Sequence, residues 1–108
     1  MKGRKRYTIL YAREVYRHVD SIDRKYHRLI RTTIEEQLSD TPERRTRNRK
    51  PLEEIPGPFG STWELRFGPD NRFRVFYEVG RKERSVWILA IGVKVKSRLL
   101  VAGEELSE

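Results

Sequence analysis

The chain has 108 residues, with 24 Lys and Arg against 16 Asp and Glu, a formal net charge of +8, and no cysteine. This length is typical of one domain with one modest core, so we expect a single domain spanning residues 1–108. Without cysteine, the chain excludes disulfides, thiolate catalysis and cysteine-based zinc sites. It also has neither a signal-peptide pattern nor the apolar run of about 18 residues of a membrane helix, so we expect a soluble, cytoplasmic protein with no membrane partner. The excess of cations favours an anionic partner, nucleic acid above all.

The first elements follow from two apolar patterns. Residues 7–11, "YTILY", are aromatic and β-branched and predict a strand. Apolar residues then recur at spacings of three and four across residues 12–38, which predicts an amphipathic helical region. Because this stretch is long for one helix, and Asp20 or Ser21 can serve as an N-cap, we predict two helices that meet near residue 20. Pro42 then ends the second helix.

Residues 43–60 show no helical or strand period and contain three prolines, two glycines and the run "RRTRNRK", which predicts a long, ordered surface loop. Three strands are expected next, at residues 62–67, 72–79 and 85–95, with hairpin turns between them. The third is apolar on both faces, as in a central strand that is covered on two sides or has one face in a groove. Residues 96–108 read as a last short strand or a docking segment.

The order of strand, two helices and antiparallel meander predicts an α+β fold, with both helices packed on one face of a small antiparallel sheet. The period of two then places Glu64, Arg66, Arg72 and Arg74 on the opposite face, where we expect a cationic hollow. Partial neutralisation by Glu64 and Glu78 is the structural alternative. The functional interpretation is that a polyanion lies in the hollow and is also held by the basic loop.

Few types of chemistry fit this composition. His18 and His27 do not have the spacing of a helical metal-ligand pair, and we expect both at helix surfaces or boundaries. Nucleophile motifs, phosphate-binding loops and dinucleotide fingerprints are absent from the sequence. RNA cleavage is compatible with it, because the substrate brings its own 2′-hydroxyl nucleophile and the protein must orient it, stabilise the phosphorane charge and move a proton. We therefore expect neither a metal nor a cofactor.

Four segments carry a resemblance to a known family: "NRKPL" at 48–52, "WELRFG" at 63–68, "RFRVFYEV" at 72–79 and "ILAIGVK" at 88–94. In this order the chain resembles the RelE/ParE superfamily, the toxins of type II toxin-antitoxin systems. The resemblance implies a RelE-like ribosome-dependent mRNA endoribonuclease (an mRNA interferase) that inhibits translation, or a ParE-like inhibitor of DNA gyrase. A catalytically weak RNA-binding protein of the same fold is the third alternative. The implied partners are the ribosome, mRNA and an acidic antitoxin encoded by a neighbouring gene.

The resemblance also implies roles for individual residues. Arg74 corresponds to the arginine that binds the scissile phosphate, Arg66 to a basic residue near the attacking hydroxyl, and Lys94 to the residue that assists the leaving group. Glu64 stands where RelE-like sites usually have a lysine or arginine, so it is either a general base or a salt-bridge partner. The C-terminal tyrosine or histidine of active members is missing, and Tyr77 is expected to face the core.

Other cations are expected to contact the RNA backbone. Lys50 also occupies a loop position where some family members have a catalytic side chain. The expected nucleic-acid-binding residues are Arg45, Arg47, Arg49, Lys50, Arg72, Lys96 and Arg98.

Overall fold

The computed structural model describes residues 6–106; Ser107 and Glu108, the end of the predicted tail, lie outside this range. The helices and 3₁₀ turns are α1 (Val15–Asp20), η1 (Arg24–Tyr26), α2 (His27–Leu38), η2 (Pro58–Gly60) and η3 (Pro69–Asn71). The strands are β1 (Thr8–Tyr11), β2 (Arg49–Pro51), β3 (Trp63–Phe67), β4 (Phe73–Gly80), β5 (Ser85–Val95), β6 (Arg98–Val101) and β7 (Glu104–Glu105). Within residues 6–106, no helix combines the length and apolar content that a membrane crossing requires.

One twisted sheet organises the described part of the chain, in the strand order β2-β3-β4-β5-β6-β7, with β1 paired in parallel to β5. All other neighbouring strands are antiparallel. The predicted meander is therefore confirmed as β3, β4 and β5, and the tail forms the hairpin of β6 and β7. Strand β5 is the centre, since it pairs with β1 over its first half and with β6 over its second.

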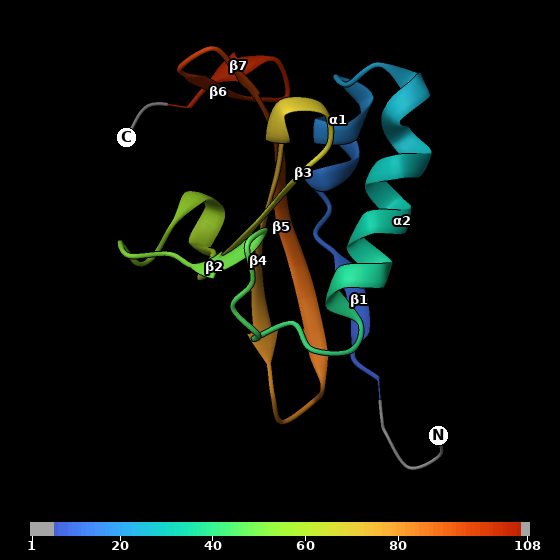
Figure 1. Cartoon of the computed structure of the whole chain (residues 1–108), viewed down its shortest axis with the longest axis vertical. Helices are drawn as coiled ribbons and strands as arrows, with labels where there is room; N and C mark the ends of the chain where they lie inside the picture. Colours follow the sequence, from blue (N-terminus) through green and yellow to red (C-terminus); the bar gives the residue numbers. More distant parts are fainter. Residues whose placement is uncertain (1–5, 107–108) are drawn as a thin grey trace.

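Both helices pack on one face of the sheet (Figure 1). The core between these two layers contains Ile30 and Ile34 of α2 and Leu65, Val75 and Ile88 of the central strands, each at most 2% exposed. Burial of these branched side chains stabilises the layers by roughly 1.5–3 kcal/mol each. The predicted α+β architecture is thus confirmed.

The break between the helices lies where it was expected, but its cap is different. The α1 helix ends at Asp20, and η1 begins after Asp23, whose carboxylate accepts a hydrogen bond from the Lys25 backbone N–H at 3.0 Å. The residue that caps the turn is therefore Asp23 rather than Asp20 or Ser21. A short polar side chain in this position satisfies one of the free N–H groups at the start of a helical turn.

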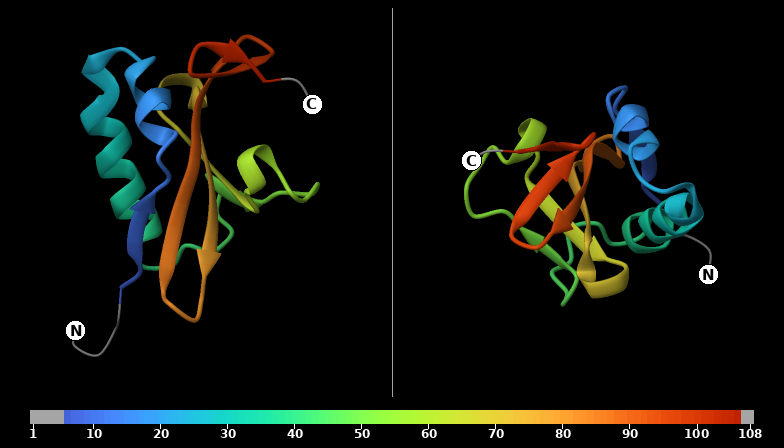
Figure 2. Two further views of the ribbon diagram at one scale, coloured as in Figure 1. Left: turned by 180° about the vertical axis from the view of Figure 1, so that it is seen from behind. Right: turned by 90° about the horizontal axis from the view of Figure 1, so that it is seen from above.

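Two segments project from the sheet face opposite the helices: the stretch from β2 through η2, and the β6–β7 hairpin (Figures 1 and 2). The first of these belongs to the predicted loop of residues 43–60. The prediction was wrong for β2, a three-residue edge strand that pairs with β3 through Lys50 and Glu64. A strand this short shows no period, and its proline is tolerated at the sheet edge.

His18 is buried, with 2% exposure, so the prediction of a surface or boundary residue was wrong. Its Nδ1 atom accepts a hydrogen bond from the Ile91 backbone N–H at 3.2 Å. That N–H falls on β5 between the residues paired with β1, which end at Ile88, and those paired with β6, which begin at Gly92. The imidazole therefore satisfies a backbone donor on the side of β5 away from β4, which neither β1 nor β6 covers at Ile91. Burial, and secondarily the nearby Arg17, lower the pKa of His18.

The lowered pKa predicts how stability depends on pH. The unfolded chain takes up a proton at His18 near the ordinary value of 6.5, whereas the folded protein resists it. This contribution to stability is therefore complete above pH 6.5 and is lost as the pH falls toward the folded pKa. We expect His18→Gln, which does not titrate, to lose about 1–3 kcal/mol at pH 8 and to flatten the decline below pH 6.5. Urea unfolding across this range measures both, with His27→Gln as the control; a decline as steep as in the wild type would contradict the prediction.

Candidate nucleic-acid interface

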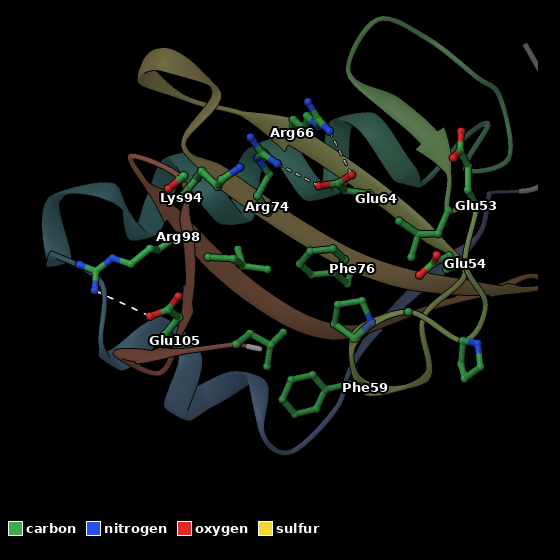
Figure 3. A pocket seen from close by; sticks show the side chains of 17 residues that line it. Glu53, Glu54, Phe59, Glu64, Arg66, Arg74, Phe76, Lys94, Arg98 and Glu105 are labelled. Carbon is green, nitrogen blue, oxygen red and sulfur yellow. Dashed lines mark hydrogen bonds and ion pairs between the residues drawn. The ribbon is translucent and has the colours of Figure 1, made fainter. Parts of the chain in front are cut away.

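A groove of about 1010 Å³ lies on the sheet face opposite the helices. Its floor includes Phe76 of β4, and it is bordered by the β2–η2 stretch on one side and the β6–β7 hairpin on the other (Figure 3). It is lined by Leu52, Glu53, Glu54, Pro56, Gly57, Pro58, Phe59, Glu64, Arg66, Arg74, Phe76, Lys94, Ser97, Arg98, Leu99, Glu105 and Leu106. All four residues expected to be catalytic, Glu64, Arg66, Arg74 and Lys94, are among them.

The centre of the cationic side is a carboxylate shared by two arginines. Arg66 and Arg74 are directly opposite each other on β3 and β4. Glu64 lies between them, with its oxygens 3.5 Å from Arg66 Nη2 and 3.2 Å from Arg74 Nη1. The Glu64 side chain is only 7% exposed. Glu64 is therefore a salt-bridge partner in this structure, as the structural alternative proposed, while the second expected partner, Glu78, lies elsewhere, opposite Trp87.

Arg74 is fixed in position by contacts at two of its nitrogens. Its Nε donates to the Asn71 carbonyl at 3.1 Å, and its Nη1 donates to Glu64 at 3.2 Å. The side chain is 13% exposed, against 37% for Arg66. A guanidinium held in this way has already lost most of its rotational freedom, so little conformational entropy remains to be lost when it binds an anion.

Lys94 and Arg98 continue the cationic side of the groove at the junction of β5 and β6 (Figure 3). Arg98 Nη1 lies 3.8 Å from Glu105 Oε1, and both side chains are 55% exposed, so solvent screens the pair strongly. In the described part of the chain, Lys94 forms no side-chain ion pair. Its backbone N–H donates to the Arg72 carbonyl at 2.7 Å, which fixes the strand at this point.

The groove is divided by charge rather than uniformly cationic. Figure 3 shows the cations near one wall and the carboxylates of Glu53 and Glu54 near the other. Its cations are Arg66, Arg74, Lys94 and Arg98, and its carboxylates are Glu53, Glu54, Glu64 and Glu105. The formal charges therefore balance, and a polyanion can approach favourably only along the arginine side.

Arg72 does not belong to the groove, so the expectation that it shares a face with Arg66 and Arg74 was wrong. Its φ and ψ of −73° and −25° are helical, because it ends η3 before the pleat of β4 begins. Its Nε donates to the Pro69 carbonyl at 3.2 Å. The side chain lines a separate hollow of about 240 Å³ together with Tyr26 of η1.

Arg49 has a structural role, which corrects its expected role in RNA binding. It is 6% exposed, and its Nη1 donates to the backbone carbonyls of Gln37 and Thr41 at the end of α2. Burial lowers the pKa of this guanidinium. Arg49 lies opposite Leu65, a core residue, so it is on the helix-facing side of the sheet. A phosphate in the groove cannot reach it.

The remaining expected RNA contacts lie outside the groove lining. Lys50 is partly buried opposite Glu64 on β2, and Arg45 and Arg47 are exposed before that strand. Lys96 is exposed in the turn between β5 and β6, where its φ is +59°. Of the seven residues expected to contact nucleic acid, Arg98 lines the groove and the other six do not.

No family model matches the sequence, and no curated protein matches it significantly. A solved structure, the toxin-antitoxin complex RelBE2 from Mycobacterium tuberculosis, contains a chain that superimposes with a TM-score of 0.63 at 21% sequence identity. The match covers 80% of this chain and 95% of that chain. The chain has a RelE-like fold. At this level of identity the likeness establishes the fold alone.

Sequence reasoning missed the wall of the groove that faces the arginines. Phe59 of η2 is 48% exposed and lines the groove with Glu53 and Glu54. These residues fall in a segment without periodicity, so no sequence pattern predicts where their side chains point. The expectation that Tyr77 faces the core is confirmed: it is fully buried, and its hydroxyl donates to the Pro42 carbonyl at 2.8 Å.

The structural role of Arg49 in the RelE-like fold can be tested against its exposed neighbour. We expect Arg49→Ala to lower the free energy of unfolding by about 2–3 kcal/mol, because two buried carbonyls lose a charged donor. Arg47→Ala, at an exposed position, should change it by less than about 0.5 kcal/mol. Urea unfolding monitored by fluorescence of the tryptophans measures both values. Equal effects of the two substitutions would contradict the assignment.

Proposed function

We propose that the protein is the toxin component of a type II toxin-antitoxin system and acts as a ribosome-dependent mRNA endoribonuclease that inhibits translation. The observation that carries the proposal is the pairing of Arg66 and Arg74 with one carboxylate, Glu64, in an open groove that Lys94 also lines. The RelE-like fold, shared with a chain of a toxin-antitoxin complex, supports the assignment.

Arg74 is proposed to bind the non-bridging oxygens of the scissile phosphate. Its donors are already oriented by Asn71 and Glu64, so they face the developing phosphorane charge without further reorganisation. Such preorganised donors stabilise a transition state more than mobile ones do. Arg66, the more exposed of the pair, is proposed to hold the nucleotide on the attacking side.

The proton transfers are assigned to Glu64 and Lys94. Glu64 accepts the 2′-hydroxyl proton while the 2′-oxygen attacks phosphorus; the bond from phosphorus to the 5′-oxygen breaks, and Lys94 protonates that oxygen. The products are a 2′,3′-cyclic phosphate and a 5′-hydroxyl. Among the described residues that line the groove there is neither histidine nor tyrosine. This limited set of acid-base groups is consistent with a requirement for the ribosome, which would hold the mRNA in the in-line geometry.

An acidic antitoxin encoded by a neighbouring gene is the proposed inhibitory partner. An acidic peptide segment would compete with RNA for the arginine side of the groove, and folding of such a segment on binding would couple charge neutralisation to burial of the apolar floor. Co-expression of the neighbouring gene should abolish toxicity. Unchanged toxicity would count against this partner.

The phosphate-binding role of Arg74 is the central prediction. Purified protein is incubated with ribosomes carrying a defined mRNA, and the 5′ ends are mapped. We expect new ends within codons, and Arg74→Ala should reduce their rate of formation at least about 100-fold, the effect of losing one charge-stabilising donor. Arg31→Ala, on the helix layer at 76% side-chain exposure, is the matched control.

Intact mRNA at stoichiometric wild-type protein would contradict the nuclease assignment. Inhibition of DNA supercoiling by gyrase on addition of the same purified protein would then favour a ParE-like toxin. The balanced charges of the groove and its lack of histidine and tyrosine among the described residues are the observations that favour this second candidate.

The substitution Glu64→Gln tests whether Glu64 acts as the general base or only as a counterion for the arginines. It keeps the shape of the side chain and removes its negative charge. Removing the shared negative charge leaves two arginines unneutralised, so mRNA should bind at least as tightly while cleavage slows by about 10²–10⁴-fold. Single-turnover cleavage on programmed ribosomes gives the rate, and its dependence on protein concentration gives the affinity. Faster cleavage by the variant would show that Glu64 only neutralises the arginines.

A further inference from the structure

Phe59 adopts a backbone conformation that is unfavourable for its residue type. Its φ and ψ are 59° and 29°, in the left-handed region, and Gly60 follows with φ of 83°. A bulky residue rarely adopts this region because its side chain crowds the backbone there, so the conformation is a candidate for a functional constraint. Packing does not fully account for the ring, because Phe59 remains 48% exposed.

The ring is positioned from below and left open on the groove side. One contact is edge-to-face with the buried His18, at 5.3 Å between ring centroids and an interplanar angle of 61°. His18 is in turn anchored to Ile91 of β5. In Figure 3, Phe59 lies across the groove from Arg66 and Arg74, with Phe76 between the two walls. The groove therefore has a cationic wall on one side and a supported aromatic ring on the other.

The two carboxylates of the β2–η2 stretch, Glu53 and Glu54, lie at the end of the groove between the arginines and Phe59 (Figure 3). Glu53 and Glu54 are exposed, line the groove, and form no hydrogen bond or ion pair with any part of the described chain. Carboxylates repel phosphate and accept hydrogen bonds from N–H donors. This end of the groove therefore suits the base of a nucleotide, while the arginine side suits its phosphate.

We infer that Phe59 is a stacking platform for one base of the bound RNA and that Glu53 and Glu54 select a base with N–H donors on its Watson–Crick edge. This inference rests on the proposed function. Guanine fits best, because its ring N1–H and exocyclic amine present two parallel donors to a carboxylate. Cytosine and adenine offer their amino group. Uracil, whose single N–H is flanked by two carbonyls, fits worst.

The test uses ribosomes programmed with mRNAs that are randomised at the codon exposed to the protein. Mapping of 5′ ends should show a preference of the wild type for guanine and discrimination against uracil at one position of that codon. Phe59→Leu should slow cleavage about tenfold or more and weaken the preference, because the stacking of a base on an aromatic side chain is lost. Phe59→Tyr, which keeps the ring, should restore both. The double variant Glu53→Gln with Glu54→Gln should slow cleavage of codons with guanine at that position and shift the preference toward uracil, whose carbonyls accept hydrogen bonds from an amide.

Ile55→Ala is the matched control, since Ile55 lies on the same segment at 62% exposure but does not line the groove. If the wild type cuts no mRNA, the proposed function fails and the inference with it. If it cuts and Phe59→Leu and the double glutamine variant keep the wild-type rate and base preference, the inference alone is overturned. If Phe59→Leu loses antitoxin binding while its cleavage is unchanged, the ring serves a protein partner and the inference is likewise overturned.

Discussion

The sharing of Glu64 by Arg66 and Arg74 is the interaction on which the groove depends. Two like charges directly opposite on antiparallel strands destabilise a sheet, and here they are paired across β3 and β4. Glu64 lies on the same face two residues before Arg66 and is close to both guanidinium groups. The same carboxylate that makes the cluster tolerable also orients it, so stability and preorganisation have one source. Neutralisation within the cluster limits its attraction for anions at long range, and Lys94 and Arg98 supply the more accessible charge.

The sequence predicted side-chain directions where they follow from a regular alternation of apolar and polar residues. Along β3 and β4 alternate residues must face opposite sides, so Leu65 and Val75 could be assigned to the core and Arg66 and Arg74 to the other face. The helical stripe similarly predicted two helices on one side of the sheet. These elements are long enough for their patterns to be read without knowledge of their neighbours.

The sequence did not predict side-chain directions that are set by a turn or by a tertiary contact. Arg72 precedes Arg74 by two residues, a spacing that places side chains on the same face of a strand. It lies in a helical turn before β4 begins, so strand alternation does not set the direction of its side chain. Arg49 belongs to a strand of three residues whose register is set only by pairing with β3. Phe59 is directed by its packing on His18, which comes from a distant helix. His18 itself follows Val15 by three residues on the apolar stripe, a signal of burial that the sequence does contain.

The parallel pairing of β1 with β5 has a consequence for how the molecule is made. Strand β1, which includes Thr8, can pair with β5 only after Ser85 and the residues that follow it have been synthesised. The sheet therefore cannot form completely until this later segment is present. Contacts this distant in sequence slow folding and favour completion after the segment has left the exit tunnel. The groove is completed at the same stage, because Lys94 lies on β5 and one of its borders is the β6–β7 hairpin.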